Sequence, residues 1–274
     1  MSTFKALLLD MDGVLFHGDR ALPGADEFLQ AISHLPYCFI TNNPIRSPAM
    51  LVEHFVRLGL PRVDESRFVT SGQATGEWLA RQQPDFGFYA VGAAGLHQTL
   101  SQYGNYDPET ADFVVVGEGE GLDFDTLTIG INLILKQGAR LVCTNPDHNV
   151  DASIDGLHRV LPGGGALVAP FAVATGQTPV FIGKPHPLLY EMAMQRLGVA
   201  APDCVMVGDR PDTDIAGAAA LQMATALVRT GRFGRGEKLP SGLEPDWDCE
   251  SLTALLDRWR DACPETFGTK TKAG

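Results

Sequence analysis

The chain has 274 residues, of which 45% are hydrophobic and 20% are charged, a composition that fits a globular protein and excludes a disordered one. Its formal net charge of −12, from 33 acidic and 21 basic residues, argues against a broad surface for nucleic acid or anionic membranes. Positive charge for an anionic ligand must therefore be local, and we expect Lys184 and a divalent cation to supply it.

Apolar runs alternate with amphipathic segments along the whole chain, which predicts an α/β fold built on a doubly wound, mostly parallel sheet. In the first part, the predicted strands are Ala6–Leu9, Tyr37–Ile40 and Arg67–Thr70, and the predicted helices are Ala25–His34 and Pro48–Gly59. This alternation is that of one half of a doubly wound domain.

The middle of the chain has an alternation of its own. The predicted elements are a strand at Phe88–Val91, a helix at Ala94–Tyr103, a strand at Phe113–Val116, a helix at Phe124–Gln137 and a strand at Arg140–Thr144. Gly138 follows the second helix, in the place where glycine commonly ends a helix. We expect this stretch to be an inserted α/β domain.

Beyond Val180 the pattern predicts a return to the first sheet. The expected elements are a strand from Val180, a helix at Pro187–Leu197, a strand at Cys204–Val207, a helix at Asp214–Leu221, a strand at Thr225–Val228 and a helix at Ser251–Cys263. We therefore predict a core in two parts, residues 1–82 and 179–265, an inserted domain at 83–178 and a flexible tail at 266–274.

Four polar segments each follow a predicted buried strand. They are Asp10-Met11-Asp12-Gly13-Val14, Thr41-Asn42-Asn43, Lys184-Pro185, and the stretch from Gly208-Asp209 to Asp214. Open parallel sheets bind their ligands at the carboxyl ends of the strands, so we expect these segments to form one site. Carboxylates, hydroxyl and amide donors and a lysine are the groups that phosphoryl transfer needs.

This set of segments resembles the haloacid dehalogenase superfamily, which is dominated by magnesium-dependent phosphatases that form an aspartyl-phosphate intermediate. The similarity is closest to the NagD-like branch, with its 4-nitrophenylphosphatases and phosphoglycolate phosphatases. The resemblance implies a Rossmann-like core with an α/β cap domain inserted between Thr41 and Lys184. It also implies a small phosphorylated metabolite as substrate, and it leaves open a homodimer formed through a face of the cap.

The first segment provides the candidate nucleophile, Asp10, whose carboxylate would attack phosphorus and divide one difficult displacement into two easier steps. Asp12 lies two residues on and would point to the same side of an extended backbone. It is the candidate general acid and base. The dehalogenases of the superfamily that this chain resembles have no second aspartate at this position, so Asp12 favours phosphoryl chemistry. Gly13 would let the backbone turn close to the phosphate.

Thr41, Asn42 and Asn43 offer hydroxyl, amide and main-chain donors to phosphate oxygens. A helix cap before Pro44 would explain the same residues without any ligand. Lys184 is the candidate point charge for the transferring phosphoryl group.

Asp209 and Asp214 supply oxygen atoms, the ligands that suit Mg²⁺. The resemblance implies that Asp10, the main-chain carbonyl of Asp12, and Asp209 bind the metal. Asp214 would then orient a metal-bound water or Lys184 and cap the following helix. We interpret Asp212 as a turn residue.

The segment Thr144-Asn145-Pro146-Asp147-His148 resembles part of the family's cap, and Asn145 and Asp147 are candidate substrate-binding residues. An ordinary Asn-Pro-Asp turn is an equally good explanation. The run Gly163-Gly164-Gly165 lacks the GxxxxGK[ST] frame of a P-loop.

Two other functions fit part of this pattern. A phosphotransferase or sugar phosphomutase would use the same acids but resolve the intermediate with a sugar hydroxyl. A phospho-aspartate signalling or ligand-binding module also combines acids, threonine and lysine around Mg²⁺. In such modules the phosphorylated aspartate does not follow the first strand, and Asp12 and a cap would be unnecessary.

The chain has an odd number of cysteines and no Cys-x-x-Cys pair, which predicts a reducing compartment. The five cysteines are Cys38, Cys143, Cys204, Cys249 and Cys263. Those at 38, 143 and 204 lie in apolar runs, so we expect them in the core. The sequence shows no leader pattern and no run approaching about 20 apolar residues, and we expect a cytoplasmic protein.

Overall fold

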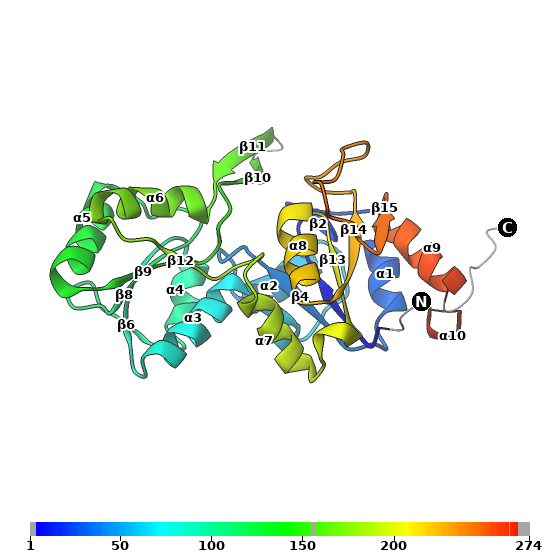
Figure 1. Ribbon diagram of the computed structural model, residues 1–274, viewed down its shortest axis with the longest axis horizontal. Helices are drawn as coiled ribbons and strands as arrows, with labels where there is room; N and C mark the ends of the chain where they lie inside the picture. Colours follow the sequence, from blue (N-terminus) through cyan, green and yellow to red (C-terminus); the bar gives the residue numbers. More distant parts are fainter. Residues whose placement is uncertain (1–3, 155–156, 263, 268–274) are drawn as a thin grey trace. The chain divides into compact units, whose positions relative to one another are not determined.

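The computed structural model describes residues 4–154, 157–262 and 264–267. The chain divides into two compact units, the first of Met1–Ile40, Val52–Arg67 and Tyr190–Gly274 and the second of Thr41–Leu51 and Phe68–Leu189. Both units are α/β with a parallel sheet, as the sequence predicts (Figure 1). The predicted boundaries between core, inserted domain and tail stay a prediction.

The larger sheet has the strand order β15-β14-β13-β1-β4-β5. Its strands are β1 (Ala6–Leu9), β4 (Tyr37–Thr41), β5 (Phe68–Thr70), β13 (Cys204–Gly208), β14 (Ala224–Val228) and β15 (Trp247–Cys249). β1 pairs in parallel with β13 on one side and β4 on the other, and all four of its residues are fully buried. A strand covered on both faces explains its uninterrupted apolar run. Apart from the strand at Val180, five strands were predicted in the first and last parts of the chain. All five are confirmed, and their ends differ from the predicted ones by at most one residue.

The helices whose residues lie mainly in the first unit are α1 (Ala25–Ala31), α2 (Pro48–Arg57), α7 (Leu188–Leu197), α8 (Ala216–Ala220), α9 (Leu252–Ala262) and α10 (Pro264–Phe267). Short elements are the hairpin β2 (Phe16–His17) and β3 (Arg20–Ala21), the 3₁₀ turns η1 (Glu65–Arg67) and η3 (Ala201–Asp203), and the π turn η4 (Pro211–Ile215). α1 and α9 lie side by side (Figure 1) and are joined by an ion pair of 2.9 Å between Arg260 and Glu27.

Aromatic rings pack at the end of the described chain. The ring of Phe267 lies 5.2 Å from that of Trp259, and Phe267 is buried. Thr266 and Phe267, which we expected in a flexible tail, belong to the helix α10. The rest of that predicted tail, and Cys263 at the predicted end of the last long helix, lie outside the described residues.

The sheet of the second unit has the order β12-β9-β8-β6-β7. Its strands are β6 (Gly87–Val91), β7 (Asn105–Tyr106), β8 (Phe113–Val116), β9 (Arg140–Cys143) and β12 (Val180–Phe181), all paired in parallel. The three strands predicted in the middle of the chain are confirmed. The buried cysteines also confirm a prediction, since Cys143 lies in β9, and Cys38 and Cys204 lie in β4 and β13.

The strand at Val180 does not return to the first sheet, so that expectation was wrong. β12 pairs with β9 of the second unit, with Val180 opposite Val142 and Phe181 opposite Cys143. A short apolar run predicts a strand, but it carries no information about which sheet the strand joins.

The helices of the second unit are α3 (Ser71–Gln82), α4 (Ala94–Leu100), α5 (Phe124–Asn132) and α6 (Gly164–Thr175), with a π turn, η2 (Leu133–Gln137), after α5. α3 and α4 cover one face of the sheet, and α5 and α6 cover the other (Figure 1). Gly138 ends the α5–η2 segment with a φ of 77°, as the sequence predicts. The helix predicted over Phe124–Gln137 is thus α-helical only as far as Asn132.

Several elements were not predicted, among them the edge strands β7 and β15 and three larger features. α3 begins with a capping box between Thr70 and Gln73 that we overlooked. α6 is apolar on every side and contains Pro170, so its sequence has no helical period, yet Val168 and Phe171 pack into the core.

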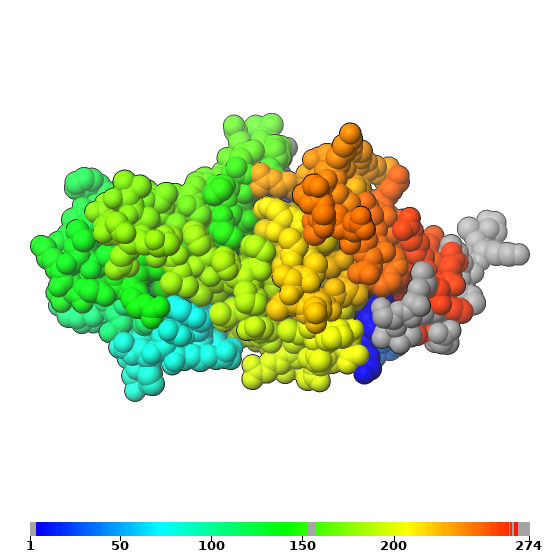
Figure 2. Space-filling model, in the orientation of Figure 1, coloured from blue at the N-terminus to red at the C-terminus, as the bar shows by residue number. Residues whose placement is uncertain are grey.

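The third is the antiparallel hairpin of β10 (Asn149–Ile154) and β11 (Leu157–Pro162). It stands out from the surface of the second unit (Figure 2), and its residues Leu157 and Val160 are exposed. Among the described residues, no helix is both long enough and apolar enough to cross a membrane.

Candidate active site

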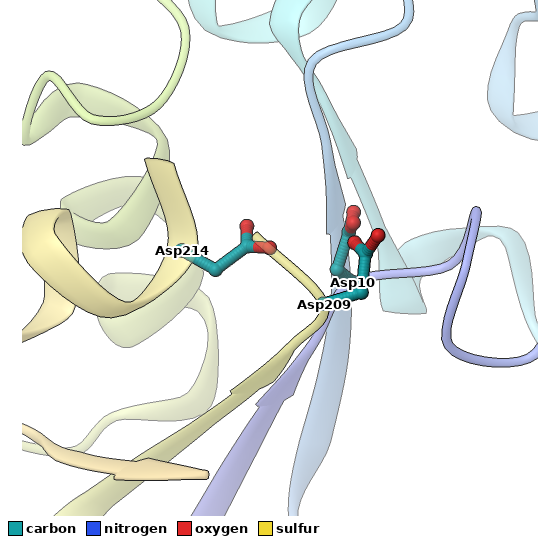
Figure 3. Close-up of side chains that lie close together, drawn as sticks. All are labelled: Asp10, Asp209 and Asp214. Carbon is teal, nitrogen blue, oxygen red and sulfur yellow. The ribbon is translucent and has the colours of Figure 1, made fainter. Parts of the chain in front are cut away.

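Three buried aspartates meet in the first unit. Asp10 directly follows β1, Asp209 directly follows β13, and Asp214 lies in η4. Each offers a carboxylate oxygen, and these oxygens lie within 4.8 Å of one another. Figure 3 shows the carboxylate of Asp214 directed toward those of Asp10 and Asp209. We call these three residues the carboxylate cluster.

The sheet places two members of the cluster side by side. β1 and β13 are parallel neighbours, with Leu9 opposite Val207, and Asp10 N–H continues the ladder with a hydrogen bond of 2.9 Å to the carbonyl of Val207. Because both strands end at the same edge, the next residue of each brings its side chain to that edge. The sequence prediction that strand ends would gather Asp10 and Asp209 is confirmed.

The turn after β13 holds the third member. The Asp214 carboxylate accepts a hydrogen bond of 3.0 Å from the main-chain N–H of Arg210. Gly208 leaves room for it, since a Cβ at that position would lie 2.3 Å from the Cβ of Asp214. Asp214 does not cap the next helix as we expected, because its carboxylate bonds backward to Arg210 and α8 begins only at Ala216.

Tyr190 is a neighbour of this turn that the sequence did not reveal. Its hydroxyl donates a hydrogen bond of 2.7 Å to the carbonyl of Thr213. Burial raises the pKa of Tyr190 well above its usual value, and the negative charges of Asp214 and Asp10 raise it further. The hydroxyl therefore stays protonated and remains a donor to the turn.

Asp212 lies in the same turn but points elsewhere. Burial alone would raise its pKa, but the hydrogen bonds and charge of Arg210 outweigh burial and lower the pKa. The two side chains form an ion pair of 2.7 Å. Asp212 is thus a turn residue, as the sequence indicated, and the structure adds its pairing with Arg210.

A loop after β14 packs against Asp209. The main-chain N–H of Arg232 donates a hydrogen bond of 2.8 Å to Oδ2 of Asp209. A Cβ on Gly231 would lie 1.9 Å from the same oxygen, and a Cβ on Gly13 would lie 2.5 Å from it. Both positions therefore require glycine, and the φ of +79° at Gly13 requires it as well.

The same loop also contacts the turn after β1. Thr230 donates a hydrogen bond of 2.7 Å from its hydroxyl to the carbonyl of Gly13, and the carbonyl of Thr230 lies 2.7 Å from Nε2 of His17. Sequence reasoning missed Thr230, Gly231 and Arg232. The signal available was their position just beyond a predicted strand of the same sheet.

Asp12 lies in the tight turn that follows Asp10. The turn is closed by a hydrogen bond of 2.8 Å from Gly13 N–H to the carbonyl of Phe16. Asp12 is exposed, whereas Asp10 is only 8% exposed. An exposed carboxyl beside a buried one can exchange protons with water, a property that a general acid and base needs.

The remaining predicted residues lie in the second unit. Thr41 is buried at the end of β4, and its Oγ1 accepts a hydrogen bond of 3.1 Å from Asn43 N–H. Asn43 in turn accepts one of 2.8 Å from Ile45 N–H through its Oδ1. These two side chains shape a turn after the strand, and their phosphate contacts stay a prediction.

Asn42 joins the turn to Lys184. Asn42 Oδ1 accepts a hydrogen bond of 2.7 Å from Lys184 N–H, and Asn42 Nδ2 donates one of 3.0 Å to the Lys184 carbonyl. The Nδ2 group donates a second hydrogen bond, of 2.9 Å, to Oδ2 of Asp147. The side-chain amide of Asn42 has no further N–H to donate, so a phosphate contact by Asn42 would have to use its main chain.

Asn145 and Asp147 belong to the same set of contacts. Asn145 Nδ2 donates hydrogen bonds of 2.8 Å to both the Asn42 carbonyl and Glu118 Oε1, and its Oδ1 accepts one of 3.1 Å from Asp147 N–H. Asn145, Asp147, Glu118 and Lys184 are all buried. We call Asn42, Glu118, Asn145, Asp147 and Lys184 the amide network.

The glycine run beside this network has a packing role. A Cβ at Gly163 would lie 2.2 Å from the carbonyl of Asp147, and one at Gly165 would lie 2.5 Å from that of Pro146. The run therefore lets the start of α6 approach the Asn145–Asp147 turn closely. This contact explains the glycines without a phosphate loop.

Comparison with known proteins agrees with this architecture. Residues 7–105 match the family described as haloacid dehalogenase-like hydrolase, and residues 181–255 match the HAD-hydrolase-like family. The chain is 35% identical to the 5'-nucleotidase YutF of Bacillus subtilis over 93% of this chain and 99% of that protein. It is 36% identical to the dihydroxyacetone phosphatase of Corynebacterium glutamicum over 95% of this chain and 94% of that protein.

Solved structures give the same result. The p-nitrophenyl phosphatase from Archaeoglobus fulgidus superposes with a TM-score of 0.84 at 28% identity, covering 93% of this chain and 98% of that one. NagD from Escherichia coli K-12 superposes with a TM-score of 0.81 at 31% identity, covering 92% of this chain and 98% of that one.

Proposed function

This chain belongs to the haloacid dehalogenase-like hydrolases as a NagD-like phosphatase acting on phosphate monoesters, and we propose that it hydrolyses small organic phosphates in a Mg²⁺-dependent reaction through an aspartyl phosphate. The observation that carries the proposal is the carboxylate cluster, in which two acids at neighbouring strand ends meet a third from the following turn. A phosphomutase would share this cluster, and the products of the reaction separate the two activities.

The cluster fits a hard divalent cation. Its donor atoms are all carboxylate oxygens, and the three side chains are at most 8% exposed. Buried like charges at this separation repel one another, which a cation would relieve. In the proposal Asp10, Asp209 and the main-chain carbonyl of Asp12 hold Mg²⁺, and Asp214 acts indirectly through a water or Lys184. Bound Mg²⁺ would neutralise charge on the phosphate and orient it.

The chemistry falls to two aspartates. A carboxylate oxygen of Asp10 attacks phosphorus, and the bond from phosphorus to the leaving oxygen breaks while Asp12 gives that oxygen a proton. Asp12, now a carboxylate, then takes a proton from water as the water oxygen attacks the same phosphorus. The bond between Asp10 and phosphorus breaks, which frees inorganic phosphate and restores both residues. The exposure of Asp12 supports its exchange of protons with solvent.

The proposal assigns the phosphate contacts to Gly13, Thr41, Asn42, Asn43 and Lys184, on the strength of the motifs that contain them. Lys184 supplies positive charge to the phosphate in a chain that has 21 basic residues against 33 acidic ones. Asn145 and Asp147 are the proposed substrate-side residues.

The test is phosphate release from a panel of esters, with Mg²⁺ and with EDTA. The panel includes a nucleoside monophosphate and dihydroxyacetone phosphate, which follow the names of the two relatives, together with sugar phosphates. Asp10→Asn should abolish release, and Asp212→Asn, which changes an acid outside the cluster, should keep it. Release that persists in Asp10→Asn would exclude this nucleophile, and an isomerised ester without free phosphate would indicate a mutase.

A further inference from the structure

Lys184 is a buried lysine whose main chain is held on both sides by one side chain. It is 2% exposed, and Asn42 accepts its N–H and donates to its carbonyl, at 2.7 and 3.0 Å. The preceding residue fits as tightly, because a Cβ at Gly183 would lie 2.6 Å from Asn42 Oδ1. The base of the lysine side chain is therefore fixed by Asn42.

Asn42 is itself fixed by contacts from three other segments. Its carbonyl accepts hydrogen bonds from Ser71 Oγ at 2.6 Å and from Asn145 Nδ2 at 2.8 Å, which use both lone pairs. Its side-chain N–H groups go to Asp147 and Lys184. A reversed amide would place Nδ2 against the N–H of Lys184, so only one orientation satisfies every group.

Glu118 fixes the orientation of Asn145 in the same way. Its carboxylate, which is 1% exposed, accepts a hydrogen bond of 2.8 Å from Asn145 Nδ2. A carboxylate and a carbonyl can only accept, so Nδ2 of Asn145 must face both, which leaves Oδ1 for the N–H of Asp147. Both groups are buried, where loss of a hydrogen bond is costly, so this contact is a strong constraint.

We propose that Asn42, Asn145 and Glu118 are positioning residues for Lys184, with the Glu118 carboxylate setting the orientation of the asparagine pair that holds the lysine main chain. The catalytic part of this inference rests on the proposed function, in which Lys184 acts on the phosphate. A flexible four-carbon side chain places its charge reproducibly only when its base is fixed, and small misplacements are costly in catalysis.

The first test measures hydrogen exchange at the Lys184 main-chain N–H, which is independent of activity. Asn42→Ala should raise that exchange rate by about tenfold or more, since the hydrogen bond that protects it is lost. Glu118→Leu should raise it by a smaller factor. Glu118→Gln should stay within about twofold of the parent, because a glutamine oxygen can still accept from Asn145.

The matched control is Gln177→Ala. Gln177 also bridges main-chain groups of the second unit, accepting from Leu141 N–H at 3.0 Å and donating to the Ala139 carbonyl at 3.2 Å. Its loss should leave exchange at Lys184 within about twofold, which corrects for general loosening of the unit. Equal exchange in Asn42→Ala and the parent would overturn the proposal.

The second test is a double-mutant cycle on kcat/KM for phosphate release. Asn42→Ala should lower kcat/KM by about 30-fold in the parent, but by less than about threefold in the Lys184→Ala background. In that background the lysine side chain that Asn42 positions is already absent. Effects that multiply would show that the Asn42 side chain acts independently of Lys184 and would overturn its positioning role. A parent that releases no phosphate would defeat the proposed function, and the exchange experiment would still decide the structural inference.

Discussion

In the first unit, three buried carboxylates bring their oxygens within 4.8 Å of one another, whereas in the second unit the buried carboxylates of Glu118 and Asp147 each accept a hydrogen bond from an asparagine amide. The carboxylate cluster concentrates like charge, which is unfavourable without a cation. The amide network instead gives each of its two carboxylates an amide donor within the protein. The first arrangement suits a ligand site, and the second suits a rigid support.

The largest expected effect comes from removing a charge of the cluster. Asp209→Asn should lower kcat by about 10³-fold or more and abolish the rise in Tm that Mg²⁺ gives the parent. That rise corresponds to about 2.7 kcal/mol at a Mg²⁺ concentration of 100 times Kd. Without Mg²⁺ the variant should melt above the parent, because one of three repelling charges is gone. Thermal melts with Mg²⁺ and with EDTA measure both.

Asp212→Asn is the control, since that acid is paired with Arg210 outside the cluster. A parent whose Tm is the same with Mg²⁺ and with EDTA would contradict a cation site.

A substitution in the amide network should have the opposite effect on stability. Asn145→Leu keeps the approximate shape but removes hydrogen bonds to Glu118, to Asn42 and from Asp147, which should lower the free energy of unfolding by about 2–4 kcal/mol. Urea unfolding measures it. Asn132→Leu removes a hydrogen bond from the surface of the same unit and should cost less than about 1 kcal/mol. Equal losses in both variants would mean that the network stabilises nothing beyond ordinary surface contacts.

A smaller effect is expected from the loop that packs against Asp209. Gly231→Ala would force a methyl group to within 1.9 Å of Asp209 Oδ2, so it should raise the Mg²⁺ concentration for half-maximal activity by about 10-fold to 100-fold. Gly234→Ala in the same loop meets its nearest atom at 3.3 Å and should behave like the parent. A Mg²⁺ titration of phosphate release compares them, and an unchanged midpoint in Gly231→Ala would show that the loop does not position the ligand.

The effect that is smallest at neutral pH comes from a buried thiol, and it grows only in alkaline solution. Burial raises the pKa of Cys143 from 9.0 to about 12. Above pH 9 the unfolded thiol loses its proton while the folded thiol keeps it, so this group's contribution to stability falls as pH rises from 9 toward 12. The slope it adds is at most about 1.4 kcal/mol per pH unit. Denaturant unfolding of Cys143→Ala at pH 8 to 11 should therefore show a flatter decline than the parent.

Cys249→Ala provides the comparison from the first unit, because burial also raises the pKa of that thiol. A slope in Cys143→Ala identical to that of the parent would exclude this thiol as a source of the alkaline loss of stability.

Local sequence was sufficient for most of the fold. Continuous apolar runs predicted β1, β8 and β13, because strands covered on both faces need no polar residues. Sequence patterns did not predict α6, since a helix that is apolar on all sides shows no helical period of hydrophobic residues. They also did not predict the exposed hairpin β10–β11.

In the site, strand-end position was sufficient to place Asp10 beside Asp209. It gave no indication of Tyr190, Thr230, Gly231 or Arg232, which meet the site through hydroxyls, a main-chain N–H or, at Gly231, the absence of a side chain. Side-chain chemistry read from a sequence cannot report such contacts, because any residue type carries a main chain.

The sequence by itself determined the chemical groups of this protein and the strand ends that carry them, since apolar runs and the polar residues that follow are local properties. Only the tertiary structure decided which sheet β12 joins and that the amide of Asn42 is held by Lys184, 142 positions away. It also decided that a π turn, and not a helix cap, brings Asp214 to the cluster. The reason is physical: a hydrogen-bonding group accepts any complementary partner, and folding selects among partners that lie far apart in the chain.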